Sequence, residues 1–89
     1  MVFKIKADPK ALIDIQQAVE YYNSKQKGLG SRFYLALKKT IITLKRNPFF
    51  EVRYDEVRCK IVKGFPYMIH YLLDEDEKTV IIYGVVYSK

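Results

Sequence analysis

The sequence predicts an α+β domain: a short N-terminal strand, then an antiparallel pair of helices packed on one face of a mainly antiparallel sheet. Two observations lead to this class. In the first half of the chain, apolar residues recur every three or four positions, which is the spacing of one helix face. In the second half, β-branched and aromatic residues alternate with polar ones, which is typical of half-buried strands. The expected order of elements is therefore β-α-α-β-β-β.

The composition is that of one small globular protein. Its 89 residues are enough for a single domain, over residues 1–89, with one core. Hydrophobic residues make up 49% of the chain, which excludes a disordered protein. No apolar run approaches the roughly 20 residues that span a bilayer and no signal peptide opens the chain, so we expect no membrane partner. Cys59 is the sole cysteine, which excludes an internal disulfide and favours the cytoplasm.

Local signals place the two helices. Asp8-Pro9 predicts the start of the first helix, with Asp as the N-cap and Pro at the first helical position. Gly28 is expected to end it as a left-handed cap, and Ser31 or Gly30 to open a second helix that ends at Asn47-Pro48. Because so few residues join the two helices, they must run antiparallel. The expected inward stripes are Ala11, Leu12, Ile15, Ala18, Val19 and Tyr22, then Phe33, Leu37, Ile41 and Leu44.

Alternation of side chains predicts the strands and assigns their faces. Strands are expected within residues 2–6, 50–54, 57–63, 65–73 and 79–87. One assembly buries a continuous apolar layer under the helices and leaves the opposite sheet face open. The core set is then Val57, Cys59, Ile61, Ile69, Tyr71, Leu73, Val80, Ile82 and Val86. The open set is Arg58, Lys60, Met68, His70, Tyr83 and Tyr87, joined by Val62, Leu72, Ile81 and Val85. A β-bulge near Gly84 would reverse the faces of residues 85–87.

The expected open face mixes cations, aromatic rings and aliphatic side chains. Such a face suits phosphates and stacked bases, or an apolar peptide. The net charge of +6 is concentrated between residues 25 and 63, which favours an anionic partner. The basic residues of that stretch are Lys25, Lys27, Arg32, Lys38, Lys39, Lys45, Arg46, Arg53, Arg58, Lys60 and Lys63, against the acids Glu51, Asp55 and Glu56.

Other motifs leave few further sites. Leu35 and Ile42, seven residues apart on the second helix, lie off its core stripe and are either edge packing or a partner surface. No His, Cys and carboxylate cluster has the spacing of a metal site. No phosphate-binding glycine loop or nucleophile elbow occurs. We therefore expect no metal and no cofactor.

A succession of short motifs along nearly the whole chain resembles the RelE/ParE family of toxins from bacterial type II toxin–antitoxin modules. The residues that carry the resemblance are Ala11, Asp14-Ile15, Ala18, Tyr21-Tyr22, Gly28-Leu29-Gly30, Phe33, Ile41, Asn47-Pro48, Val57-Arg58, Phe65-Pro66-Tyr67, Ile69, Tyr71, Val80 and Ile82-Tyr83-Gly84-Val85. The resemblance implies a strand, a helix hairpin and an antiparallel sheet. It also implies a cognate antitoxin protein that wraps the toxin.

The resemblance implies two possible targets. RelE-like members cleave messenger RNA in the ribosome without metal, with cations on the open sheet face that stabilise the pentavalent phosphorane. ParE-like members act against DNA gyrase and lack that set. Arg58 matches the family's strand arginine and Tyr87 its terminal His or Tyr, whereas Met68 stands where cleaving members carry a second arginine. The chain also stops at Lys89, before the basic and aromatic tail of many members.

The sequence therefore favours a ParE-like toxin that inhibits growth through a nucleic-acid-associated target such as DNA gyrase, and leaves open whether the protein is an enzyme. The first alternative is a ribosome-dependent endoribonuclease that cuts mRNA. The second is a degenerate, non-toxic homologue that only binds a partner. The candidate catalytic residues of a nuclease are Arg58, Lys60, His70 and Tyr87. The candidate partner-binding residues are Arg58, Lys60, Tyr83, Val85, Leu35 and Ile42.

Overall fold

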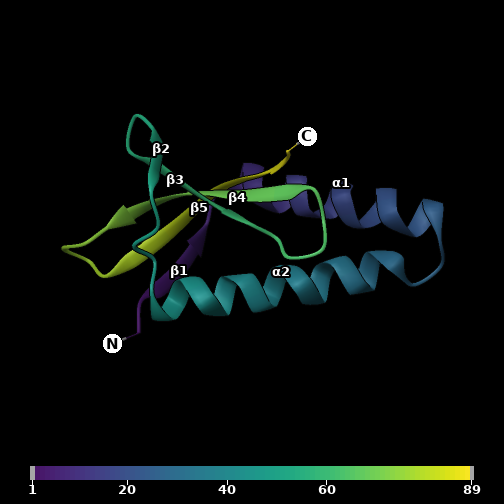
Figure 1. Ribbon diagram of the computed structural model, residues 1–89, viewed down its shortest axis with the longest axis horizontal. Coiled ribbons are helices and arrows are strands. Elements are labelled where there is room, and N and C mark those ends of the chain that lie inside the picture. Colours follow the sequence, from purple (N-terminus) through teal and green to yellow (C-terminus); the bar gives the residue numbers. More distant parts are fainter. Residues whose placement is uncertain (1, 89) are drawn as a thin grey trace.

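The computed structural model describes residues 2–88. Met1 and Lys89 lie outside the described residues, and so does the predicted chain end at Lys89. The elements are β1 (Lys4–Ala7), α1 (Pro9–Lys25), α2 (Leu29–Arg46), β2 (Val52–Tyr54), β3 (Val57–Ile61), β4 (Tyr67–Asp74) and β5 (Thr79–Tyr87). They form one sheet in the order β1-β5-β4-β3-β2, with β1 parallel to β5 and the other pairs antiparallel. The joint between α1 and α2 lies at the opposite end of the molecule from the β4–β5 turn (Figure 1). The predicted fold class is confirmed.

The helix starts follow local chemistry, with one correction. The Asp8 carboxylate accepts a hydrogen bond from the Lys10 backbone N–H at 2.9 Å, and Pro9 stands at the first helical position, as predicted. Gly28, however, is the N-cap of α2 and not the C-cap of α1. Its φ of 84° lies in the left-handed region, where a residue with a side chain would be strained. The second helix consequently begins at Leu29, before the predicted Gly30 or Ser31.

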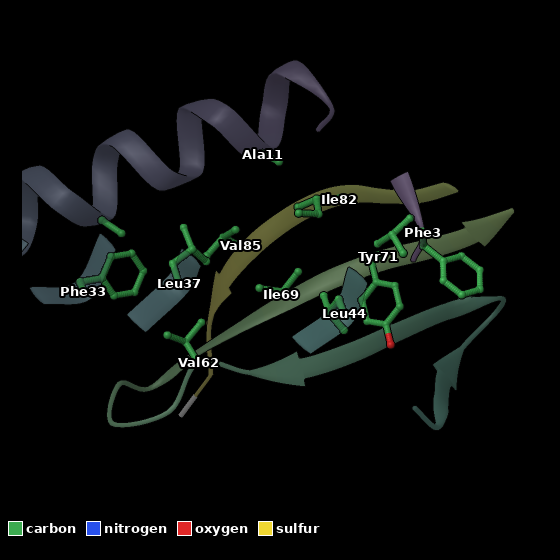
Figure 2. Packing of buried hydrophobic residues seen from close by; sticks show 12 residues of the cluster. Phe3, Ala11, Phe33, Leu37, Leu44, Val62, Ile69, Tyr71, Ile82 and Val85 are labelled. Atoms are coloured by element: carbon green, nitrogen blue, oxygen red, sulfur yellow. The ribbon is translucent and has the colours of Figure 1, made fainter. Parts of the chain in front are cut away.

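The core lies between the helix hairpin and one face of the sheet (Figure 2). Phe33, Leu37 and Leu44 of α2 meet Ile69 and Tyr71 of β4, and these five side chains are at most 1% exposed. An aromatic group closes the core near the hairpin joint, with ring centroids 5.1 to 5.9 Å apart. Its members are Tyr22, Phe33, Phe65 and Tyr67. Leu12, predicted to face inward, is instead 56% exposed.

The predicted faces of residues 58–61 in β3 are wrong, whereas Val57 is buried, as predicted, with 5% of its surface exposed. The register of β3 pairs Arg58 with Tyr71 and Lys60 with Ile69, and residues directly opposite each other in a sheet share a face. Tyr71 and Ile69 are fully buried under the helices, so Arg58 and Lys60 lie on the helix side of the sheet. Cys59 pairs with His70, and Ile61 pairs with Met68. Cys59 and Ile61 therefore belong to the open face.

A buried residue after the strand explains the reversal. Val62, predicted for the open face, is 0% exposed and belongs to the core, whereas Ile61 is 52% exposed. A shift of one residue turns a whole strand over, so burial of Val62 places Lys60 on the core side with it. Because β3 has only the three-residue β2 beyond it, the long stems of its cations can lie along the rim of the core while their heads reach outward.

A β-bulge between β4 and β5 reverses the end of β5. Tyr71 pairs with Ile82 but His70 with Gly84, so Tyr83 is the extra residue. The bulge anticipated near Gly84 is therefore present. As a result, Val85 is 3% exposed in the core and Val86, predicted for the core, is 40% exposed.

The carboxylate of Asp14 stabilises this bulge from α1. It accepts a hydrogen bond from the Val85 backbone N–H at 3.0 Å and pairs with the Lys10 ammonium at 3.2 Å. A Cβ atom at Gly84 would lie only 3.3 Å from the Asp14 Oδ2 atom. Because Gly84 has no side chain, there is room for the Asp14 carboxylate, which accepts the hydrogen bond of the Val85 N–H that the bulge leaves without a strand partner.

Two isoleucines test the observed faces. Ile69→Ala should lower the free energy of unfolding by roughly 2–5 kcal/mol, because it opens a cavity in the core. Ile61→Ala, the matched control on the open face, should cost less than about 1 kcal/mol. Urea unfolding of both variants measures the difference. Equal losses would contradict the register of β3.

Candidate functional site

The structure does not assemble the four predicted catalytic residues on one face. His70 lies on the open face, as predicted. Arg58 and Lys60 lie on the helix side, opposite Tyr71 and Ile69. Tyr87 lies opposite Tyr67, also on the helix side, with the two ring centroids 5.6 Å apart. The prediction that these residues share the open face is therefore wrong for three of the four.

The two cations of β3 contact the segment between α2 and β2. The Arg58 Nη1 atom donates a hydrogen bond to the Phe50 carbonyl at 2.7 Å. The Lys60 ammonium lies 4.4 Å from the centroid of the Phe50 ring, within the range of a cation–π contact. Nearby, the buried Tyr71 hydroxyl donates to the Pro48 carbonyl at 2.7 Å. Arg58 and Lys60 thus help hold this connecting segment against the sheet.

A hydrogen-bonded pair occupies the open face. The Tyr54 hydroxyl and the Nδ1 atom of His70 are 2.8 Å apart, and Cys59 lies directly across from His70 on β3. Tyr83, predicted for this face, is 45% exposed. Sequence reasoning missed Tyr54, because β2 has only three residues and no alternation that assigns its faces. Nothing in the spacing relates residues 54 and 70.

The environment keeps this pair neutral near pH 7. Desolvation by burial, together with the charges of Lys10 and Arg53, lowers the pKa of His70 below its ordinary 6.5. Desolvation raises the pKa of Tyr54, so the phenol keeps its proton and can donate it to an unprotonated Nδ1. Burial also raises the pKa of Cys59, which keeps the thiol from acting as a thiolate nucleophile. The pair can therefore accept and pass a proton.

A groove of about 850 Å³ runs between α2 and β3, and we call it the α2–β3 groove. Its lining comprises Arg32, Leu35, Ala36, Lys39, Thr40, Thr43, Lys60, Ile61, Lys63 and Gly64. Four of these residues are cations and none is an acid. The groove therefore combines a predicted partner-binding leucine, Leu35, with a predicted partner-binding cation, Lys60.

The other predicted partner-binding residues have different surroundings. Val85 is buried in the core, so its side chain is not available to a partner, which corrects the prediction. Ile42 is 49% exposed on α2 but does not line the groove. A second hollow, of about 500 Å³, lies near the β4–β5 turn and has mostly acidic polar side chains. Among residues 2–88, no group of three or more His, Cys, Asp or Glu could hold a metal ion.

Comparisons with known proteins show which fold this chain shares. A scan against protein-family models found no match, and a search of curated proteins found none either. Among solved structures, a chain of the "Chromosomal ParDE TA system from P. aeruginosa" superposes with a TM-score of 0.86, at 12% identity, over 99% of this chain and 98% of that one. This chain has the RelE/ParE toxin fold.

A second solved structure carries the same RelE/ParE fold. A chain of the toxin–antitoxin complex RelBE2 from Mycobacterium tuberculosis superposes with a TM-score of 0.73, at 18% identity, over 98% of this chain and 99% of that one. The fold that the sequence resemblance implied is thus confirmed. No helix within residues 2–88 is long and apolar enough to cross a membrane.

The single histidine makes the open face easy to probe. Because the folded state favours neutral His70, the proton NMR titration of its ring should have a midpoint below 6.5. The unfolded chain in urea, the control, should titrate near 6.5. Since the unfolded state then binds the proton more readily, this contribution to stability is complete above the unfolded pKa and is lost as the pH falls through the folded pKa. The His70→Gln variant should lack that loss, and a folded midpoint above 6.5 would contradict the neutral pair.

Proposed function

We propose that this protein is the toxin of a toxin–antitoxin module, and that it acts as ParE-like toxins do, on DNA gyrase and without cutting RNA. The similarity to the ParDE and RelBE2 structures extends over at least 98% of each chain, which supports a toxin role for the whole domain. In this proposal the protein works in the cytoplasm, where a cognate antitoxin binds it.

The separation of Arg58 and Lys60 from His70 is the observation that carries the ParE-like choice. Phosphodiester cleavage needs cations at the developing negative charge and a proton acceptor at the same phosphate. Here the β3 cations lie across the sheet from the only histidine. Met68, in the position of a cleaving member's second arginine, shares the face of His70 and offers an uncharged thioether. This separation supports a toxin that does not cut RNA.

A specific observation favours one other candidate, RNA cleavage. The Tyr54–His70 pair is exposed on the open face, and the charges of Lys10 and Arg53 lie near enough to lower the pKa of His70. Such a pair could deprotonate a ribose hydroxyl while a nearby cation meets the phosphate. In that case activity depends on Tyr54 and His70 and not on Arg58.

Induced expression tests the proposal. We expect growth to stop, messenger RNA to remain intact and the DNA damage response to rise, as for a poisoned gyrase. Tyr54→Phe and His70→Gln should leave growth inhibition unchanged, because no proton transfer is involved. RNA integrity and a damage-response reporter, read in the same cultures, measure the outcome. An empty vector is the control.

Each other result contradicts a named part of the proposal. Cut message that the two open-face variants protect, by on the order of 10²–10³ in rate, would favour the nuclease. Cut message that needs Arg58 and Tyr87 instead would support the catalytic set predicted from the sequence. Normal growth of cells that contain folded protein would favour the non-toxic homologue.

A further inference from the structure

The side of α2 that faces away from the sheet carries exposed apolar side chains. Leu35 is 57% exposed and Ile42 is 49% exposed. They are seven residues apart, so they lie on one stripe of the helix. The core residues of α2, among them Leu37 and Leu44, lie on the opposite stripe. The core therefore leaves Leu35 and Ile42 in contact with solvent.

Leu12 of α1 extends this apolar stripe across the two helices, which lie side by side (Figure 1). Leu12 is 56% exposed, although the sequence predicted that it faces inward. Near the joint, the Asn23 side chain accepts a hydrogen bond from the Gly30 N–H at 2.8 Å, which aligns the helices. Because the helices are antiparallel and rise equally per residue, Leu12 lies about level with Ile42. The two side chains thus belong to one surface.

Positive charge surrounds this surface. The 18 residues of α2 include five cations and no acid. The helical spacing places these cations in two rows, one on each side of the apolar stripe. The rows are Arg32, Lys39 and Arg46 on one side and Lys38 and Lys45 on the other. We call the surface formed by these five cations with Leu12, Leu35 and Ile42 the hairpin face.

An anionic lipid bilayer has the chemistry that this face lacks. Long cationic side chains can reach headgroup phosphates while the apolar residues between them contact the acyl region. Clusters of about four to eight cations on an amphipathic helix are typical of binding to anionic lipids. A second copy of the chain is disfavoured, because two such faces carry charge of the same sign. Duplex nucleic acid matches the cations, but its phosphates offer no apolar partner for Leu35 and Ile42.

We infer that the hairpin face binds the surface of an anionic membrane, with Leu35 and Ile42 at the boundary between headgroups and acyl chains and the α2 cations at the phosphates. Such peripheral contact needs no spanning segment. The expectation of no membrane partner came from the lack of a long apolar run, so it does not apply to this contact. The inference is independent of the proposed function, since lipid binding requires neither gyrase nor RNA as the target.

Removal of charge from the hairpin face tests the inference. Lys38→Gln/Lys39→Gln should weaken binding to vesicles of equal parts phosphatidylglycerol and phosphatidylcholine by about tenfold or more, because each cation near an anionic surface contributes about fivefold. The matched control, Lys4→Gln/Lys6→Gln, removes two exposed lysines of β1 from the open face and should weaken binding less than about threefold. Vesicle flotation at about 0.1 M salt measures both.

The two aliphatic residues separate lipid from nucleic acid. Leu35→Gln/Ile42→Gln keeps the charge and should weaken vesicle binding by about fivefold or more, because the lost side chains no longer bury apolar surface in the bilayer. The same variant should bind a DNA duplex of about 20 base pairs as the wild-type protein does, since that binding depends on charge alone. Fluorescence anisotropy measures duplex binding, and circular dichroism confirms that all three variants are folded.

Several results would overturn the inference. Vesicles of phosphatidylcholine alone that bind as tightly as the anionic ones would show that charge is not recognised. Equal losses in the two lysine variants, or no loss in the aliphatic variant, would show that the hairpin face is not the contact. Tighter binding to the duplex than to anionic vesicles of equal phosphate concentration, weakened only by the α2 lysine variant, would assign the face to nucleic acid. Absence of vesicle binding by the wild-type protein would also contradict the inference.

Discussion

The alignment of β3 against β4, with Arg58 opposite Tyr71, is the constraint on which the rest of this structure depends. Two side-chain hydrogen bonds to the connecting segment accompany it: the Tyr71 hydroxyl reaches the Pro48 carbonyl, and Arg58 reaches the Phe50 carbonyl. A buried tyrosine hydroxyl without an acceptor is costly, so moving β3 or this segment would lose stability. The same alignment sends the β3 cations to the helix side and leaves a neutral pair on the open face.

As a consequence, the two surfaces differ in chemistry. The open face has a neutral imidazole beside a phenol, whereas the α2–β3 groove has four cations around exposed aliphatic side chains. A RelE/ParE fold by itself does not choose a target, and solved structures at 12% and 18% identity define the fold alone. In the function proposed here, the preference for gyrase over RNA cleavage rests on which groups share a face, and the register of β3 determines that.

The sequence predicted the elements well because their signals are local. Asp8 marks the start of α1 by accepting a hydrogen bond from the N–H of Lys10, only two residues away. The apolar residues of the helices follow the helical spacing and do not also fit the alternation of a strand. The sequence prediction failed where the face of a strand depends on residues outside that strand. Alternation in β3 is equally regular for either face, and the choice depended on Val62 and on the exposed edge beyond the strand. The Tyr54–His70 pair and the groove join residues from separate elements, so no spacing in the chain predicts them.

The central claim is that this register places Arg58 and Lys60 across the sheet from His70. The most direct test is the cross-strand contact that defines it. Because Val62 and Tyr67 are hydrogen-bonded partners, Cys59 and His70 form a non-hydrogen-bonded pair, whose Cα atoms lie only about 4.5 Å apart in antiparallel sheets. The account predicts a strong nuclear Overhauser effect between the Hα protons of Cys59 and His70. A strong effect between the Hα protons of Lys60 and His70 instead would contradict it.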